Sequence, residues 1–222
     1  MKLVNSKYGL DIEFVENRIT TLVVEKPKYM SDIIQNIMCQ INGLEGSFVL
    51  SDEKNIKFEK DVIFITEPFH VDLNGKKIIN KLYGQLENIT KELTEDYDVI
   101  NRNIIKSLEK ITDGITYNNL KYNLEFDWKE LFKLYDVKVE ENYESLEEKL
   151  EEYIKILSGI LCPKLVIFLN FKSYLEQEQM ENLVMSSFYN KVPLLLIESN
   201  ETYQMENEKV FIVDKDRCLI VK

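Results

Sequence analysis

The chain has 222 residues, of which 45% are hydrophobic and 30% are charged. This composition is typical of a folded globular protein and excludes both a disordered tail and a small disulfide scaffold. Its 39 acidic and 28 basic residues give a net charge of −11, whereas affinity for DNA comes mostly from Lys and Arg side chains on phosphates. Any DNA-binding function therefore requires that positive charge gathers locally.

Cysteine usage and the lack of long apolar runs favour a cytoplasmic protein without membrane association. The three cysteines, Cys39, Cys162 and Cys218, are far apart and lack the paired spacing of zinc ligands. Free thiols of this kind are typical of a reducing compartment. No apolar run approaches the roughly 20 residues of a membrane span, and the first residues lack the apolar segment of a signal peptide.

The first third of the chain predicts strands grouped around one helix. Runs of β-forming residues predict strands at residues 2–4, 11–15, 19–24, 47–50 and 62–66. Pro27 ends the third strand, and apolar residues then recur at helical spacing up to Gly43. The fifth strand is apolar throughout, as expected for a strand that is covered on both faces.

The middle of the chain predicts helices. Between Leu82 and Ile111 the apolar residues recur at steps of three and four, in a pattern that repeats every eleven residues. This helical period indicates either one long helix or two helices broken near Thr94, which would cap the second. Two more helices are expected at residues 124–135 and 145–161. Residues 136–143 connect them.

Strand and helix patterns alternate again near the end of the chain. We expect a helix at residues 176–189 and strands at residues 164–169, 193–197, 209–213 and 218–221. Buried strands separated by a helix imply parallel βαβ pairing. The sequence therefore predicts an α/β fold with a discontinuous head domain, residues 1–70 and 162–222, and an inserted α-helical leg domain, residues 71–161.

No catalytic motif is recognisable. The pair Gly75-Lys76 lacks the other glycines and the hydroxyl residue of a phosphate-binding loop. His70 is the only histidine, and no motif supports a nucleophile around it. Glu147 and Lys149 resemble half of a nuclease motif, but they fall in a Glu/Lys-rich helix whose charges would be solvated. We therefore expect no enzyme activity and no bound nucleotide.

Acidic residues crowd the second half of the predicted leg. Ca²⁺ takes about six to eight oxygen ligands from carboxylates and carbonyls, so these acids are candidate metal ligands. The spacing matches no EF-hand loop, and ordinary solvated acids would show the same pattern. Besides Asp136, the candidates are Glu125, Asp127, Glu140, Glu141 and Glu144.

Lysines in and near the predicted loops are the candidates for contact with DNA phosphates. They are Lys26, Lys28, Lys54, Lys57, Lys60, Lys121 and Lys129. Glu53, Glu59 and Asp61 are interleaved among them, so they form no basic tract. An ordinary surface of mixed charge is the alternative interpretation.

Short structural motifs lie along the chain: LYGQLEN at 82–88, LEFD at 124–127, VKVE at 137–140, LVIFLN at 165–170, YL at 174–175, LLLIE at 194–198 and VDKD at 213–216. Together with the length and the acidic balance, they resemble the short-form Csn-two family of type II-A CRISPR systems. That family acts in spacer acquisition.

The resemblance implies a head similar to that of ABC-type ATPases, but degenerate and without a working nucleotide site, and a helical leg. It implies a homotetrameric ring with a positive central hole, which encircles the ends of double-stranded DNA without sequence specificity. Ca²⁺ held by carboxylates near the head–leg junction would keep the ring in shape, and Glu125 and Asp127 lie in a matched motif. The implied protein partners are the spacer integrase and the RNA-guided effector nuclease.

Two other classes of function stay open on the sequence. An acidic adaptor would scaffold proteins and bind no DNA. A degenerate NTPase or a metal nuclease would turn over ATP or DNA. A mobility-shift assay with linear duplex would distinguish the adaptor from a DNA-binding protein. Turnover assays with ATP and with labelled DNA would detect an enzyme.

Overall fold

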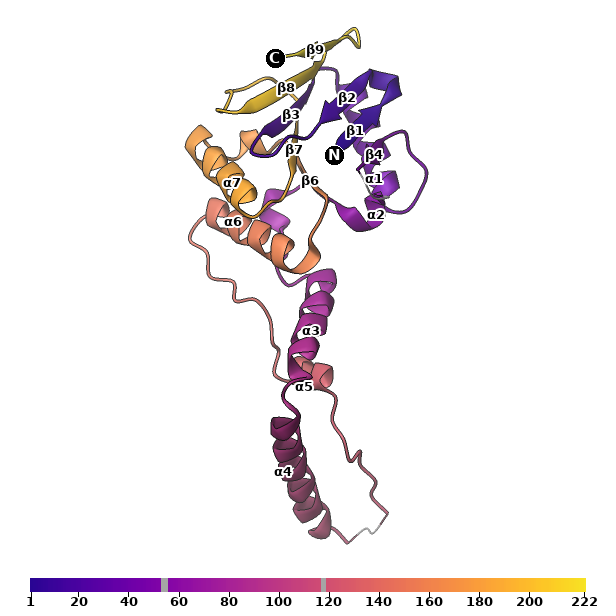
Figure 1. The fold of residues 1–222 in the computed structure, drawn as a ribbon, viewed down its shortest axis with the longest axis vertical. Coiled ribbons are helices and arrows are strands. Elements are labelled where there is room, and N and C mark those ends of the chain that lie inside the picture. Colours follow the sequence, from indigo (N-terminus) through magenta and orange to yellow (C-terminus); the bar gives the residue numbers. More distant parts are fainter. Residues whose placement is uncertain (53–55, 117–118) are drawn as a thin grey trace. The chain divides into compact units, whose positions relative to one another are not determined.

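The computed structural model describes residues 1–52, 56–116 and 119–222 (Figure 1). The chain divides into two compact units, which are Met1–Asp72 with Asn142–Lys222, named the head, and Leu73–Glu141, named the leg. The second junction therefore precedes residue 142 instead of following residue 161, where the sequence predicts it. The reason is that α6 (Leu146–Ile156) packs against α7 (Gln177–Tyr189) within the head.

A six-stranded sheet has the order β5-β6-β7-β3-β8-β9. Its strands are β3 (Ile19–Val24), β5 (Val62–Ile65), β6 (Leu165–Leu169), β7 (Leu194–Glu198), β8 (Glu208–Val213) and β9 (Leu219–Val221). In this order, each strand is parallel to the next from β5 as far as β8. Strand β9 pairs with β8 in the antiparallel direction. The predicted α/β fold with parallel βαβ pairing is confirmed, since β6, α7 and β7 form one such unit.

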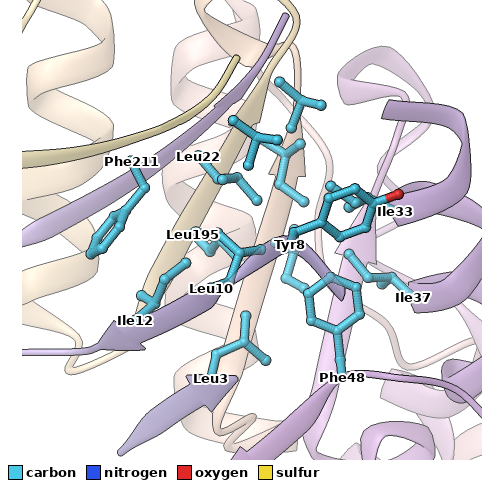
Figure 2. Close-up of a cluster of buried hydrophobic side chains, with 14 of the residues drawn as sticks. Leu3, Tyr8, Leu10, Ile12, Leu22, Ile33, Ile37, Phe48, Leu195 and Phe211 are labelled. Atoms are coloured by element: carbon cyan, nitrogen blue, oxygen red, sulfur yellow. The ribbon is translucent and has the colours of Figure 1, made fainter. Parts of the chain in front are cut away.

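A smaller antiparallel sheet has the order β2-β1-β4 and comes from the first part of the chain. Its strands are β1 (Lys2–Asn5), β2 (Leu10–Glu13) and β4 (Val49–Ser51). Figure 2 shows side chains of this sheet, such as Leu3 and Ile12, in one core with Leu22 and Leu195 of the large sheet. Ile33 of α1 (Pro27–Ile41) joins the same core. Burying each such side chain contributes about 1.5–3 kcal/mol.

Short helical segments connect these elements. They are η1 (Ser6–Tyr8), α2 (Phe58–Asp61), η2 (Pro68–His70), the π-helical η3 (Leu157–Leu161) and η4 (Phe171–Ser173). Within the described part of the chain, no helix is both long enough and apolar enough to cross a membrane.

The leg contains α3 (Lys76–Thr90), α4 (Thr94–Asp113) and α5 (Trp128–Leu134). Of the two sequence alternatives, the structure therefore has the broken helix. The N-cap of α4 is Leu93, which makes no capping bond, so the predicted capping role of Thr94 is wrong. Tyr83 of α3 packs against Phe132 of α5, with ring centroids 5.7 Å apart. None of the residues of α4 is buried in a single copy.

Candidate nucleic-acid interface

The candidate metal ligand Asp127 has a structural role in the leg. Its Oδ1 atom accepts hydrogen bonds from the backbone N–H groups of Lys129 and Glu130, at 2.7 and 3.2 Å, and so caps α5. Capping by a carboxylate also suits the positive end of the helix. Glu125 lies two residues before this cap and is exposed.

The other candidate ligands lie between α5 and α6. Glu141 accepts a hydrogen bond from Asn74 at 2.8 Å. Glu140 and Glu144 are exposed, and Glu144 lies in the head, where its backbone N–H donates to Glu148. Across residues 1–52, 56–116 and 119–222, no three His, Cys, Asp or Glu side chains gather to hold a metal ion. The five acids in this conformation therefore do not fit a calcium site, and the site stays a prediction.

Two candidate lysines belong to the leg. Lys121 is exposed in the segment before α5. Lys129 forms an ion pair with Glu87 of α3, at 2.7 Å, with both side chains 40% exposed. Such an exposed pair contributes only about 0.2–1 kcal/mol, so Lys129 would exchange this partner for a phosphate at little loss of stability.

The other candidate lysines belong to the head, except that Lys54 lies outside the described residues. Lys57 and Lys60 are exposed at the two ends of α2. Lys26 and Lys28 lie at the start of α1, and Lys28 is exposed. The structure therefore divides the lysine candidates of the head between α2 and the start of α1.

Two basic residues that the sequence analysis did not select lie at the start of α1. Arg217 comes from the turn between β8 and β9, and Lys7 comes from η1. Their side chains lie over the rings of Tyr29 and Tyr8, as the Lys26 side chain lies over Tyr29. For Arg217, the only signal in the sequence was its place in a polar turn between two strands. Such a signal does not identify the tyrosine rings that the side chain contacts.

The head also contains a buried polar network that the sequence analysis missed. Lys172 Nζ lies 2.6 Å from Glu208 Oε1, which also accepts a hydrogen bond from the hydroxyl of Thr21. Glu198 accepts a hydrogen bond from the backbone N–H of Lys172 at 3.2 Å. Burial raises the pKa of Glu198 to about 7, although Lys172 favours its charged form. These groups line a pocket of about 20 Å³, which has room for little more than a water molecule.

A pocket lies at the carboxyl ends of β3 and β7. It is lined by residues that follow these strands, including Glu25, Pro27, Ser199 and Asn200. Ligands of open α/β sheets bind at carboxyl ends of this kind. The connection from β3 to α1, however, contains only Glu25 and Lys26, with no glycine to bring backbone amides close to phosphates.

The head and leg together define a two-unit α/β protein with basic side chains at a strand-to-helix junction. The family model described as "CRISPR-associated protein (Cas_Csn2)" matches residues 40–217. Because this match covers most of the chain, the chain belongs to the Csn2 family of CRISPR-associated proteins.

Two relatives and two solved structures are similar to the chain. CRISPR-associated protein Csn2 of Streptococcus agalactiae is 23% identical over 216 residues, covering 95% of this chain and 94% of the relative. CRISPR-associated protein Csn2 of Enterococcus faecalis is 23% identical over 211 residues, covering 90% of each. A putative ABC transporter ATP-binding protein of Pyrococcus furiosus has 10% identity and a TM-score of 0.39, covering 91% of this chain and 88% of that one. The ATP-binding cassette MJ1267 has 13% identity and a TM-score of 0.36, covering 92% and 79%.

Proposed function

We propose that this protein acts in type II-A CRISPR adaptation as a non-catalytic, cytoplasmic ring that binds the ends of double-stranded DNA. The observation that carries the proposal is membership of the Csn2 family over most of the chain. The ring is a homotetramer, and it acts beside the spacer integrase and the RNA-guided effector nuclease during the acquisition of new spacers.

Exposed apolar residues on the leg support the assembly of several copies. Ile89, Val99, Ile111 and Leu124 are 55–66% exposed in a single copy. Large apolar side chains that are exposed in one copy are candidates for contact with another copy. A second copy would cover these residues, which we propose as part of the contacts within the tetramer.

Local lysines reconcile DNA binding with a net charge of −11 per copy. The outer surface of a tetramer repels DNA, whereas a few lysines from each copy, gathered around one hole, attract it. Contacts to phosphates carry no sequence information and release counterions. Binding is therefore independent of sequence and sensitive to salt.

Calcium is the proposed stabiliser of the ring. The carboxylates of Glu125 and Asp127, with Glu140, Glu141 and Glu144, supply oxygen ligands of the kind that Ca²⁺ prefers. Since these acids do not gather in the single copy, assembly would have to complete the site. Removal of Ca²⁺ by a chelator should then lower the mass of the assembly.

A gel shift on one plasmid before and after linearisation tests the proposed ring. A closed ring threads onto free ends, so the linear form should bind and the relaxed circle should not. Equal affinity for both forms would contradict threading. Failure to bind either form would favour the acidic adaptor, and turnover of ATP or labelled DNA would favour an enzyme.

A further inference from the structure

Three segments of the head bring cations onto a pair of tyrosine rings. Tyr8 and Tyr29 lie with their ring centroids 5.8 Å apart. The Arg217 guanidinium lies 5.0 Å from the Tyr29 centroid and 5.8 Å from that of Tyr8. Lys26 Nζ lies 4.8 Å from the Tyr29 centroid, and Lys7 Nζ lies 5.3 Å from that of Tyr8. We name these five residues the tyrosine–cation cluster.

The tyrosine rings hold these cations without consuming all their hydrogen-bond donors. A ring face attracts a guanidinium or an ammonium through its quadrupole and leaves N–H groups free. Lys26 Nζ also donates to the Tyr29 hydroxyl and the Lys215 carbonyl, both at 3.4 Å. Among the described residues, no carboxylate lies within 4.0 Å of Arg217, Lys26 or Lys28. Arg217 thus combines an exposed side chain with a fixed position and unused donors.

The charge around the cluster differs in sign from that of the whole chain. The three segments carry the cations Lys7, Lys26, Lys28, Lys215 and Arg217 and the carboxylates Glu25, Asp32, Asp214 and Asp216. Asp32 pairs with Lys7 at 3.0 Å, and Asp214 accepts backbone hydrogen bonds within its own turn. The excess is therefore positive here, in a protein whose net charge is −11.

The start of helix α1 has a local charge pattern that favours an anion. Helix α1 begins at Pro27 without a capping side chain or an acidic residue in its first turn, while Lys26 and Lys28 lie at its positive end. A bound anion would offset this positive charge at the start of the helix, which adds support to the geometry of the cations.

We propose that the tyrosine–cation cluster is a phosphodiester-binding site of the head, with Arg217 as its main phosphate ligand. This site rests on the proposed DNA binding. Arg217 and Lys7 are added here as phosphate ligands to Lys26 and Lys28, which were already candidates from the sequence. Tyr8 and Tyr29 are only 3% and 9% exposed, so their rings position cations and do not stack on bases. The site therefore contacts the nucleic-acid backbone and is indifferent to sequence.

The test compares variants of the full chain in salt titrations with a linear duplex. Removing the two main cations in R217A/K26A should weaken binding about tenfold and reduce the log–log salt slope by about 0.9 for each phosphate that is no longer neutralised. R217K should retain part of the affinity, because it keeps the charge and removes the planar fork. Arg18, exposed just before β3, gives the matched control R18A, which should bind like the parent.

The outcomes separate this proposal from the proposed function. K28E changes an exposed side chain and gives the same readout if R217A/K26A fails to fold. If the parent binds duplex and both variants bind it with the same affinity as the parent, the proposed role of the cluster would be overturned. The proposed function would still stand. The parent could instead bind a single-stranded RNA probe and not the duplex. If the variants then lose binding to the RNA, the cluster would be supported and the proposed function contradicted. A parent that binds neither probe would overturn both.

Discussion

Lys172 and Glu208 form an ion pair inside the head, with side chains that are 3% and 0% exposed. Lys172 Nζ also donates to the Tyr203 carbonyl at 2.9 Å, and Glu208 Oε2 accepts from the Met205 N–H at 2.8 Å. The pair thereby holds the segment between β7 and β8 against the sheet. Desolvated charges of this kind are stable only while both partners are present.

Replacing Lys172 by Met should leave Glu208 buried and uncompensated. We expect a loss of about 3–5 kcal/mol in the free energy of unfolding, measured by urea denaturation. The matched control is Lys222→Met, which breaks an exposed pair with Glu201 and should change stability by less than about 1 kcal/mol. Similar losses in the two variants would show that the buried pair has no special role.

Glu198 should make the stability of the head depend on pH. Its pKa rises from an ordinary value of 4.5 to about 7 in the fold, mainly through burial, so the folded state binds this proton more tightly than the unfolded state. Stability should therefore fall as pH rises from about 4.5 to about 7, by up to about 3 kcal/mol from this group. Glu198→Gln should flatten that part of the pH profile of urea unfolding, and an unchanged profile would contradict the assignment.

At the scale of elements, helix α5 depends on a residue that is also a candidate calcium ligand. Asp127 caps α5 through one carboxylate oxygen, and Asn caps helices about as well as Asp. Asp127→Asn therefore separates the two roles, because it keeps the cap and removes the charge. Asp127→Ala removes both and should cost about 1 kcal/mol even without calcium.

The double variant Glu125→Gln/Asp127→Asn should bind Ca²⁺ more weakly in calorimetric titration. Its thermal stability in a chelator should equal that of the parent, since the cap is retained. Unchanged calcium affinity would remove these two residues from the predicted site. It would leave the membership of the family untouched.

Helix and strand types could be predicted from the sequence because the apolar patterns are regular. The strands of the parallel sheet are buried on both faces and stand out as apolar runs, as Leu194–Glu198 does. The tyrosine–cation cluster could not be predicted, because Lys7, Lys26 and Arg217 meet only through tertiary packing. The assignment of α6 to the leg failed for the same reason, since an amphipathic pattern does not identify its partner.

At the scale of the whole molecule, α4 has an apolar stripe and no buried residue in a single copy. Light scattering with Ca²⁺ should give the mass of a tetramer. Val99→Asp/Ile111→Asp should lower that mass, because it places charge on residues that are 55% and 64% exposed. The matched control Leu44→Asp changes a side chain of the head that is 64% exposed and should leave the mass unchanged. A monomeric parent at micromolar concentration would contradict the tetramer.

The central strand of the large sheet has a consequence for synthesis on the ribosome. Strand β3 lies between β7 and β8, pairing Thr20 with Leu195 and with Lys209. A ribosome adds about 5–20 residues per second, so β3 leaves the exit tunnel many seconds before either partner exists. The nascent chain must keep this apolar strand from aggregating until the whole leg has been made, and a message truncated before β7 yields a product whose large sheet cannot form.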